Sequence, residues 1–253
     1  MNHIHMLDNG LIYAGGDGLA LTWMDAIVDG RPVTPRTGCQ VEINALWYND
    51  IKFAIDLAQR SWDKEFVAEW DSVVANFPTV FKETFWSKEI GYLADYVDGD
   101  YKNFQVRPNM LIAASLPFAP ISEKIRQLVL KCVTEELLVD KGIRSLSPKD
   151  PEYKGHYSGT QAERDAAYHQ GTVWPWLLFP FTDCILKVYP ESAPEVLNRI
   201  LYRFDGCMSS YGLSTIAEIT DGDPPYKPNG CISQAWSVAA LLYMKWKIEQ
   251  VKK

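Results

Sequence analysis

The sequence contains none of the short motifs by which proteins commonly bind a nucleotide or activate a catalytic serine. GxGxxG, GxxxxGK[ST] and GxSxG are all absent. The five cysteines are an odd number with no CxxC pair, which argues against a disulfide framework or a zinc site and predicts reduced thiols in a cytoplasmic protein. His169 has no second histidine at ligand spacing, and His156 is a single distant candidate, so we predict neither a metal nor a cofactor.

Positive charge and long apolar runs are also scarce. The formal net charge is −7 and the pI is near 5.2, whereas nucleic acids and anionic membranes are bound through basic surfaces. No run of 18 apolar residues exists, and the N-terminus has neither the apolar core nor the cleavage site of a signal peptide. We therefore predict a soluble cytoplasmic protein that binds neither nucleic acid nor membrane.

Aromatic residues, in contrast, are abundant. They make up 13% of the 253 residues and include nine tryptophans, a bulky and amphipathic residue suited both to filling a core and to lining a pocket. With 47% hydrophobic residues and neither a β-rich segment nor a flexible linker, the chain is expected to form one large domain over residues 1–253.

Apolar periodicity predicts a helical protein with long loops. The expected helices are 40–60, 62–85, 107–115, 121–138, 171–188, 191–209 and 230–250. Glycine followed by a short alternating apolar stretch recurs at Gly91, Gly142 and Gly212, which suggests an array of helix pairs. The loops 8–39, 86–106, 140–170 and 210–229 hold most of the polar and aromatic clusters, so we expect the functional site on loops above a helical scaffold.

Two of these loops contain candidate catalytic carboxylates. Asp25 lies beside Trp23 with apolar neighbours on both sides, and partial desolvation there would raise its pKa, as a general acid requires. Glu218 ends a short apolar stretch before a loop rich in glycine and proline. The nearby Asp221 and Asp223 have the character of turn residues.

The segment ERDAAYHQGTVWPW, residues 163–176, has the composition of a sugar-binding site. Sugar hydroxyls need directional hydrogen-bond partners, whereas the C–H faces of sugars lie against flat rings. The polar groups include Asp165, His169 and Gln170, and the rings include Trp174 and Trp176. Two separated carboxylates among aromatic residues, without a cofactor motif, favour glycoside hydrolysis over redox chemistry or phosphoryl transfer.

Several motifs together resemble the amylo-1,6-glucosidase domain of glycogen debranching enzymes. TWMDA, TPRTG, VEINALWYN, LPF, RDAAYHQGTVWPW, AEITDGDPP and QAWS occur in the order found in that family, over almost the whole chain. The resemblance implies an all-α fold, the (α/α)6 toroid of six inner and six outer helices. It also implies inverting hydrolysis of the α-1,6-linked glucose at branch points of glycogen or a limit dextrin.

The same resemblance implies roles for individual residues. Asp25 resembles the family's general acid, and Glu218 resembles the general base. Asp165 is a competing candidate for the base because it lies in the polar cluster of residues 163–176. The expected sugar-binding residues are Trp23, Arg36, Glu42, Asn44, Asp165, His169, Gln170, Trp174 and Trp176. For Glu42 alone, a favourable position at a helix N-terminus is an equally good explanation.

The helix count departs from the family pattern. The resemblance implies that the general acid precedes the sixth helix of the toroid and the general base precedes the twelfth. Because Asp25 precedes the first of the seven expected helices and Glu218 precedes the last, these seven resemble helices six to twelve. The expectation is an incomplete toroid whose apolar helix faces are exposed. Two alternatives stay open: a truncated, inactive carbohydrate-binding remnant, and a related helical-barrel hydrolase acting on another α-glucoside.

Overall fold

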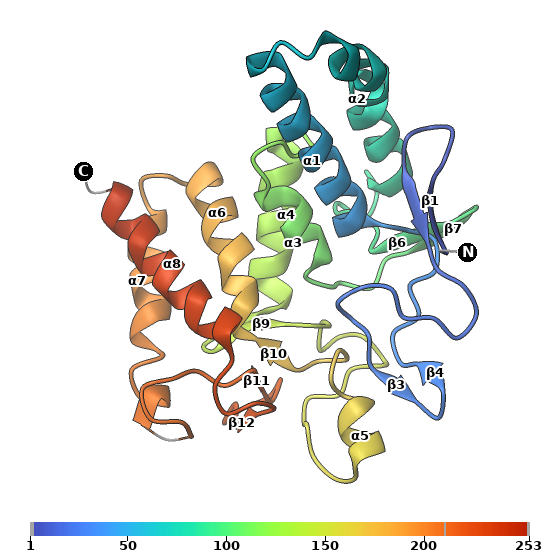
Figure 1. Cartoon of the computed structure of the whole chain (residues 1–253). Helices are drawn as coiled ribbons and strands as arrows, with labels where there is room; N and C mark the ends of the chain where they lie inside the picture. The colour runs from blue at the N-terminus through green and yellow to red at the C-terminus, as the bar shows by residue number, and fades with distance from the viewer. Residues whose placement is uncertain (1–2, 210, 252–253) are drawn as a thin grey trace.

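Seven helices of seven residues or more form an inner and an outer row in the computed structural model, which describes residues 3–209 and 211–251 (Figure 1). They are α1 (Val41–Arg60), α2 (Lys64–Phe85), α3 (Asn109–Ser115), α4 (Glu123–Glu136), α6 (Leu178–Val188), α7 (Ala193–Tyr202) and α8 (Ala235–Val251). In the inner row, α1 contacts α3, α3 contacts α6, and α6 contacts α8. In the outer row, α2 packs on α1, α4 packs on α3 and α6, and α7 packs on α6 and α8.

Apolar spacing and helix capping account for the longer helices. In α2, Phe77, Phe81 and Phe85 recur every four residues and are fully buried, so one stripe of the helix faces the core. Asp63 caps α2 by accepting a hydrogen bond from the Phe66 amide at 3.0 Å. Ser122 caps α4 by accepting a hydrogen bond from the Ile125 amide.

Short antiparallel strands occupy the loops between the helices. The largest sheet has the order β12-β11-β10-β9-β8, and a second has the order β5-β6-β7; β1 pairs with β2, and β3 pairs with β4. The bounds are β1 (Ile4–Met6), β2 (Ile12–Ala14), β3 (Ile27–Val28), β4 (Arg31–Pro32), β5 (Cys39–Gln40), β6 (Tyr96–Asp98), β7 (Tyr101–Asn103), β8 (Leu138–Val139), β9 (Gly142–Arg144), β10 (Val173–Trp174), β11 (Ile219–Thr220) and β12 (Pro228–Asn229). Strands β3, β4 and β9 to β12 gather at the lower end of the helices in Figure 1, together with the short helix α5 (Gln161–Asp165).

The helical framework is confirmed, but several predicted boundaries are wrong. The helix expected at 171–188 begins at Leu178, because Val173 and Trp174 pair with the neighbouring strands and Pro175 opens a 3₁₀ turn, η1 (Pro175–Leu177). The helix expected at 191–209 ends at Tyr202, followed by the 3₁₀ turn η2 (Cys207–Ser209).

The last helix and one loop were also predicted incorrectly. The helix expected at 230–250 begins at Ala235, because Gly230 has a left-handed φ of 68° and the Gln234 amide bonds to Ile216. Helix α5 lies within the predicted loop 140–170, where Thr160 and Glu163 form a capping box that the sequence reading missed. The glycine repeat leads into a strand at Gly142, whereas no strand begins at Gly212.

The two end helices of the inner row, α1 and α8, carry exposed apolar side chains. They lie on opposite sides of the row in Figure 1. Phe53 and Leu57 are exposed on α1, as are Leu242 and Trp246 on α8. The expectation that an open arc of helices leaves apolar faces uncovered is confirmed. None of the described helices is both long and apolar enough to cross a bilayer.

Candidate active site

Six aromatic rings from three segments of the chain meet at the loop-bearing end of the helices. They are Trp23, Tyr168, His169, Trp174, Trp176 and Trp236, and we call them the aromatic cluster. Trp23 makes edge-on contacts with His169, Trp174 and Trp176, with ring centroids 5.3, 5.4 and 5.2 Å apart. Such edge-to-face contacts are favourable for aromatic quadrupoles, so the rings hold one another in fixed orientations.

Short elements bring these rings together. Trp174 lies in β10, which pairs with β9 and β11, and Trp176 lies in η1 immediately after it. Trp236 comes from the first turn of α8 and stacks on Trp176 at 5.3 Å. Trp174 is 2% exposed, whereas Trp236 is 41% exposed. The cluster therefore has a buried base and a rim that a ligand can reach.

Glu218 lies beside the aromatic cluster, directly before β11. Its Oε2 accepts a hydrogen bond from the Cys231 amide at 3.1 Å, and its Oε1 accepts from the Gln234 side chain at 3.3 Å. Burial, followed by the interaction of the Tyr168 hydroxyl with the same carboxylate, raises the pKa of Tyr168. Glu218 is half-buried, so the carboxylate is fixed by several donors and stays within reach of solvent.

A glycine makes room for this carboxylate. Gly230, at the end of the β11–β12 hairpin, has a left-handed φ of 68°. A Cβ atom at this position would lie 2.3 Å from Oε2 of Glu218. A larger residue there would displace the carboxylate, which gives Gly230 a role in the site beyond the turn itself.

Asp25 is exposed, contrary to the expectation that its apolar neighbours would desolvate it. The preceding residue, Met24, is fully buried, whereas Asp25 lies on the solvent side of the same segment. Asp25 nevertheless follows Trp23 by two residues, and Trp23 contacts His169 and Trp174, the two rings that also contact Tyr168. The structure therefore places both candidate carboxylates on segments that meet at the aromatic cluster.

Arg36 and Glu42, two of the expected sugar-binding residues, face each other in the interior. Nη1 and Nη2 of Arg36 donate to the two carboxylate oxygens of Glu42 at 2.5 and 2.7 Å, and Nε donates to Asp95 at 2.7 Å. The side chains of Arg36 and Glu42 are each 2% exposed. Burial alone would lower the pKa of Arg36, but the charges of Asp95 and Glu42 outweigh burial and raise it.

The ion cluster of Arg36, Glu42 and Asp95 reaches Trp23 through one intermediate. The amide nitrogen of Asn109 donates to Asp95 at 2.7 Å, and the amide oxygen of Asn109 accepts from the indole N–H of Trp23 at 2.7 Å. This chain of bonds orients the indole. Asn109 and Asp95 were not singled out in the sequence, because nothing in their local surroundings marks them as partners of Trp23 and Arg36, which lie 86 and 59 positions away.

Asn44 and Gln170 also bond within the protein. The Asn44 amide donates to the carbonyls of Ile12 and Gln40 and accepts from the Ile12 amide, which fastens β2 to the start of α1. Gln170 is 4% exposed; it accepts from Arg107 at 2.6 Å and donates to the Val33 carbonyl. These contacts give both residues a part in holding the loops that carry the site.

Arg107 is a buried arginine that the sequence reading missed. Its guanidinium donates to the carbonyl of His169 at 2.7 Å, in addition to Gln170. Burial, which outweighs the charge of Asp95, lowers the pKa of Arg107 to about 10. Since it bonds to carbonyl and amide oxygens on two consecutive residues, Arg107 fixes the backbone of the segment that carries the aromatic cluster.

His169 is 1% exposed and stacks on Trp174, with an interplanar angle of 9°. Neither ring nitrogen has a hydrogen-bond partner among the described residues. Burial, followed by the charges of Arg107 and Arg36, lowers the pKa of His169 to about 3. The imidazole is therefore neutral near pH 7 and acts as a flat, uncharged ring within the cluster.

The acidic residues around Glu218 have mostly structural contacts. Asp221 accepts from the Tyr157 amide at 3.0 Å, and Asp223 accepts from the Tyr153 hydroxyl at 2.8 Å. These bonds join the loop after β11 to the loop that precedes α5, so both aspartates stabilise contacts between loops as well as their own turn. Asp165, the competing base, ends α5 and is half-buried.

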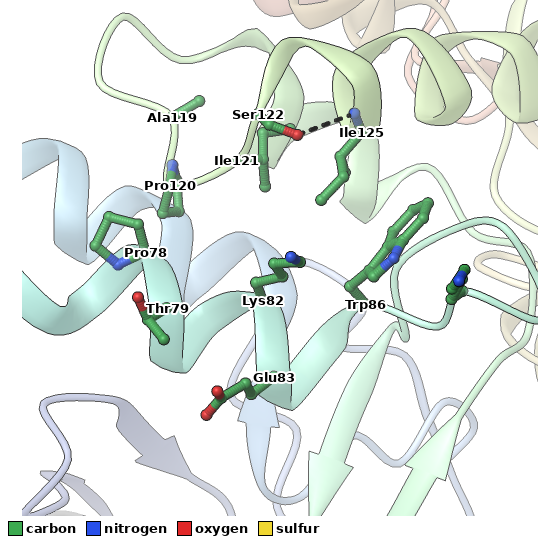
Figure 2. Close-up of a pocket in the computed structure, with 11 residues that line it drawn as sticks. Pro78, Thr79, Lys82, Glu83, Trp86, Ala119, Pro120, Ile121, Ser122 and Ile125 are labelled. Carbon is green, nitrogen blue, oxygen red and sulfur yellow. Dashed lines mark hydrogen bonds between the residues drawn. The ribbon is translucent and has the colours of Figure 1, made fainter.

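A large cavity lies away from the aromatic cluster. It has a volume of about 690 Å³ and lies between α2 and the segment that leads into α4, with Pro78, Lys82, Trp86 and Ile125 among its walls (Figure 2). Its one carboxylate is Glu83, so it cannot supply an acid and a base together. Within the described residues, no group of three or more His, Cys, Asp or Glu side chains is arranged to hold a metal ion.

The family model for amylo-α-1,6-glucosidase matches residues 2–243. The chain belongs to the amylo-α-1,6-glucosidase family. It is 27% identical over 296 aligned residues to the glycogen debranching enzyme of Saccharomyces cerevisiae, an alignment that covers 92% of this chain and 19% of the yeast protein. The chain thus spans about a fifth of the length of that relative, and its motifs identified the family correctly.

Solved structures confirm the fold class. The chain is similar to the neutral trehalase of Saccharomyces cerevisiae, with a TM-score of 0.63 and 13% identity over 83% of this chain and 38% of the trehalase. It is also similar to a mannosylglycerate hydrolase of Thermus thermophilus, with a TM-score of 0.59 and 13% identity over 82% of this chain and 47% of that one. The helical rows therefore correspond to part of the (α/α)6 glycosidase fold, with small sheets added in the loops.

The ion cluster should be essential for stability. Replacing Asp95 by Asn leaves Arg36 with one carboxylate instead of two in the interior, and we expect the free energy of unfolding to fall by about 3 kcal/mol. Urea unfolding at neutral pH measures this loss. Asp56→Asn, which removes the exposed ion pair with Arg60, is the matched control and should cost less than about 1 kcal/mol. Equal effects of the two substitutions would contradict the assignment.

His169 should make the protein sensitive to acid. Its pKa is about 3 in the folded state against an ordinary value of 6.5, so the unfolded chain binds the proton first as the pH falls. The stability associated with the neutral ring is complete above about pH 6.5 and is lost progressively toward pH 3. His169→Phe should therefore flatten the dependence of unfolding free energy on pH in this range. A variant with the same pH dependence as the unsubstituted chain would show that His169 is not the group responsible.

Proposed function

We propose that this chain carries the catalytic groups that hydrolyse the α-1,6-linked glucose at branch points of an α-glucan such as glycogen or a limit dextrin. The observation that carries the proposal is the meeting of the segments bearing Asp25 and Glu218 at one exposed aromatic rim. The family membership and the name of the yeast relative support the substrate class.

In this mechanism, Asp25 is the general acid. Its carboxyl gives a proton to the oxygen on C6 of the acceptor sugar as the bond between that oxygen and C1 of the terminal glucose breaks. Asp25 is exposed in the chain, and a bound glucan would cover it and exclude water. Trp23, two residues before the acid, is held by the ion cluster and Asn109, so the acid lies on a segment with a fixed anchor.

Glu218 is the general base. It takes a proton from a water molecule that attacks C1 from the opposite face of the sugar, and the product is glucose with inverted configuration. The bonds from Cys231 and Gln234 orient the carboxylate without covering it. An inverting pair needs roughly 6.5–9.5 Å between its carboxyl groups to leave space for the water.

The aromatic cluster supplies the surface on which the sugar ring lies. Trp176 and Trp236 stack on each other near the rim, and flat apolar faces suit the C–H face of a pyranose ring. Arg36, Glu42 and Asn44 act one layer below, because their polar atoms are already bonded inside the protein. His169 and Gln170 likewise position the rings rather than reach solvent.

Binding without turnover is a second candidate. The exposure of Asp25 favours it, because a general acid is most effective when its pKa is raised toward the working pH by a less polar environment. Release of glucose from a branched substrate by the chain itself would rule this candidate out.

Loss of either carboxylate should abolish turnover. We expect Asp25→Asn and Glu218→Gln each to lower the rate of glucose release from a branched limit dextrin by roughly 10²–10⁴-fold, with glucan binding retained. A coupled assay for free glucose and a separate binding measurement test both parts.

Asp29→Asn is the matched control, since Asp29 is exposed in the same segment and asparagine tolerates its left-handed φ of 51°. Asp165→Asn tests the competing base; its inactivity beside an active Glu218→Gln would reverse the assignment.

The configuration of the product tests the mechanism independently. An inverting pair releases β-glucose from an α-1,6 linkage, because the water attacks opposite to the departing oxygen. Proton NMR in the first minutes of the reaction, before mutarotation, distinguishes the two anomers. Initial release of α-glucose would contradict the assigned roles of Asp25 and Glu218.

A further inference from the structure

The turn between α1 and α2 presents a tryptophan to solvent at a position that disfavours it. Trp62 is 82% exposed, and its φ of 62° lies in the left-handed region. Residues with a Cβ atom pay a steric cost there, and bulky residues are rare. Trp62 therefore combines an unfavourable backbone conformation with an unburied indole.

The surrounding hydrogen bonds show that the conformation belongs to a tight helix ending. The amide of Asp63 bonds to the Ala58 carbonyl at 2.9 Å, and the amide of Trp62 bonds to the Gln59 carbonyl. This places Trp62 at the residue after the helix end, where glycine is the usual choice. Asp63 then caps α2, so the turn fixes the backbone while the fold gains almost nothing from the indole.

A shallow cavity of about 280 Å³ adjoins the indole. Ala58 and Val67 contribute apolar walls, and the polar groups are Gln59, Asp63, Lys64 and Asp71. The volume is close to the lower end of the roughly 300–1,000 Å³ typical of small-molecule sites. An amide, two carboxylates and an ammonium group thus surround one flat ring.

This combination suits a sugar better than a protein partner. Pyranose rings lie on an indole face while their hydroxyls bond to surrounding amides and carboxylates. A stable protein interface needs roughly 800 Å² from each partner and several apolar anchors, whereas one indole with polar neighbours provides much less.

We propose that the α1–α2 turn is a second binding site for the α-glucan chain, centred on Trp62. The proposal rests on the proposed function, since it assigns another site to the same substrate. Helix α1 has 20 residues and so is about 30 Å long, with the ion cluster at its N-terminal end and Trp62 just beyond its C-terminal end. The turn lies at the top of Figure 1, and the loops of the candidate active site lie at the bottom.

This separation determines which substrates use the site. A polymeric glucan reaches both ends of α1, so binding at Trp62 raises the local concentration of chain ends near the active site. A short branched oligosaccharide cannot span the distance. Trp62 should therefore affect the binding and hydrolysis of glycogen and leave those of a short substrate unchanged.

The test uses substitutions with opposite effects on stability and binding. Trp62→Gly relieves the left-handed strain, so we expect a higher midpoint of thermal unfolding together with roughly tenfold weaker retention in native gels that contain glycogen. Trp62→Tyr keeps an aromatic face and should retain most of the binding. Tyr202→Ala removes another aromatic side chain, which is 76% exposed, and is the matched control. It should change neither the midpoint of thermal unfolding nor the retention in glycogen gels.

Three results would overturn the proposal. Unchanged retention of Trp62→Gly would show that the indole does not bind glycogen. A lower unfolding midpoint would show that the ring stabilises the fold. Self-association of the unsubstituted chain that Trp62→Gly abolishes, measured by sedimentation velocity, would assign the residue to an interface between copies.

Glucose release separates failure of this site from failure of the proposed function. If the chain releases glucose from glycogen and Trp62→Gly does so equally well at low glycogen concentration, the second site is wrong and the function stands. If no variant releases glucose while retention by glycogen still depends on Trp62, the glucan site stands and the catalytic assignment is wrong.

Discussion

The buried ion cluster of Arg36, Glu42 and Asp95 is the constraint on which the site depends. Three charged groups in the interior are tolerated because each finds partners of opposite charge with good geometry. The guanidinium joins the loop before β5, the first turn of α1 and the start of β6. Asn109 extends the connection to α3 and to Trp23. A loop that would otherwise be free to move is thus attached to three elements of the scaffold.

The aromatic cluster depends on this anchor and on the strands below it. Strand β10 lies between β9 and β11, so the pairing that places Trp174 also places Glu218, the residue before β11. Arg107 fixes the same segment from the other side through the backbone of His169 and the side chain of Gln170. Small sheets in the loops therefore do what the helices alone cannot: they set the relative positions of rings and carboxylate.

The helices and the loops of this protein have different roles. The helices bury regular apolar stripes, such as that of Phe77, Phe81 and Phe85, and provide a rigid support. The loops carry the polar chemistry and leave an accessible rim at Trp236 and Asp25. The turn at the far end of α1 does not follow this division. The indole of Trp62 is exposed to solvent, and the left-handed backbone conformation of Trp62 disfavours a bulky residue.

Sequence patterns predicted the helices well and the loop strands poorly. Helical periodicity extends over many residues and depends on local spacing, so α1, α2 and α4 were found within a few residues. Strands of two or three residues have no periodicity to detect, and their pairing joins segments far apart in the chain. For that reason Val173 and Trp174 were predicted as helix, and Ala235 as the interior of a helix rather than its start.

The sequence by itself determined the family, the helical framework and the candidate pair Asp25 and Glu218, because these depend on dense local motifs. The tertiary structure decided which polar residues are free. Four of the polar residues that we expected to bind sugar are bonded inside the protein: Arg36, Glu42, Asn44 and Gln170. Whether a side chain meets solvent or a buried partner depends on residues distant in the chain, such as Asp95 for Arg36 and Arg107 for Gln170, and burial without such a partner would be too costly.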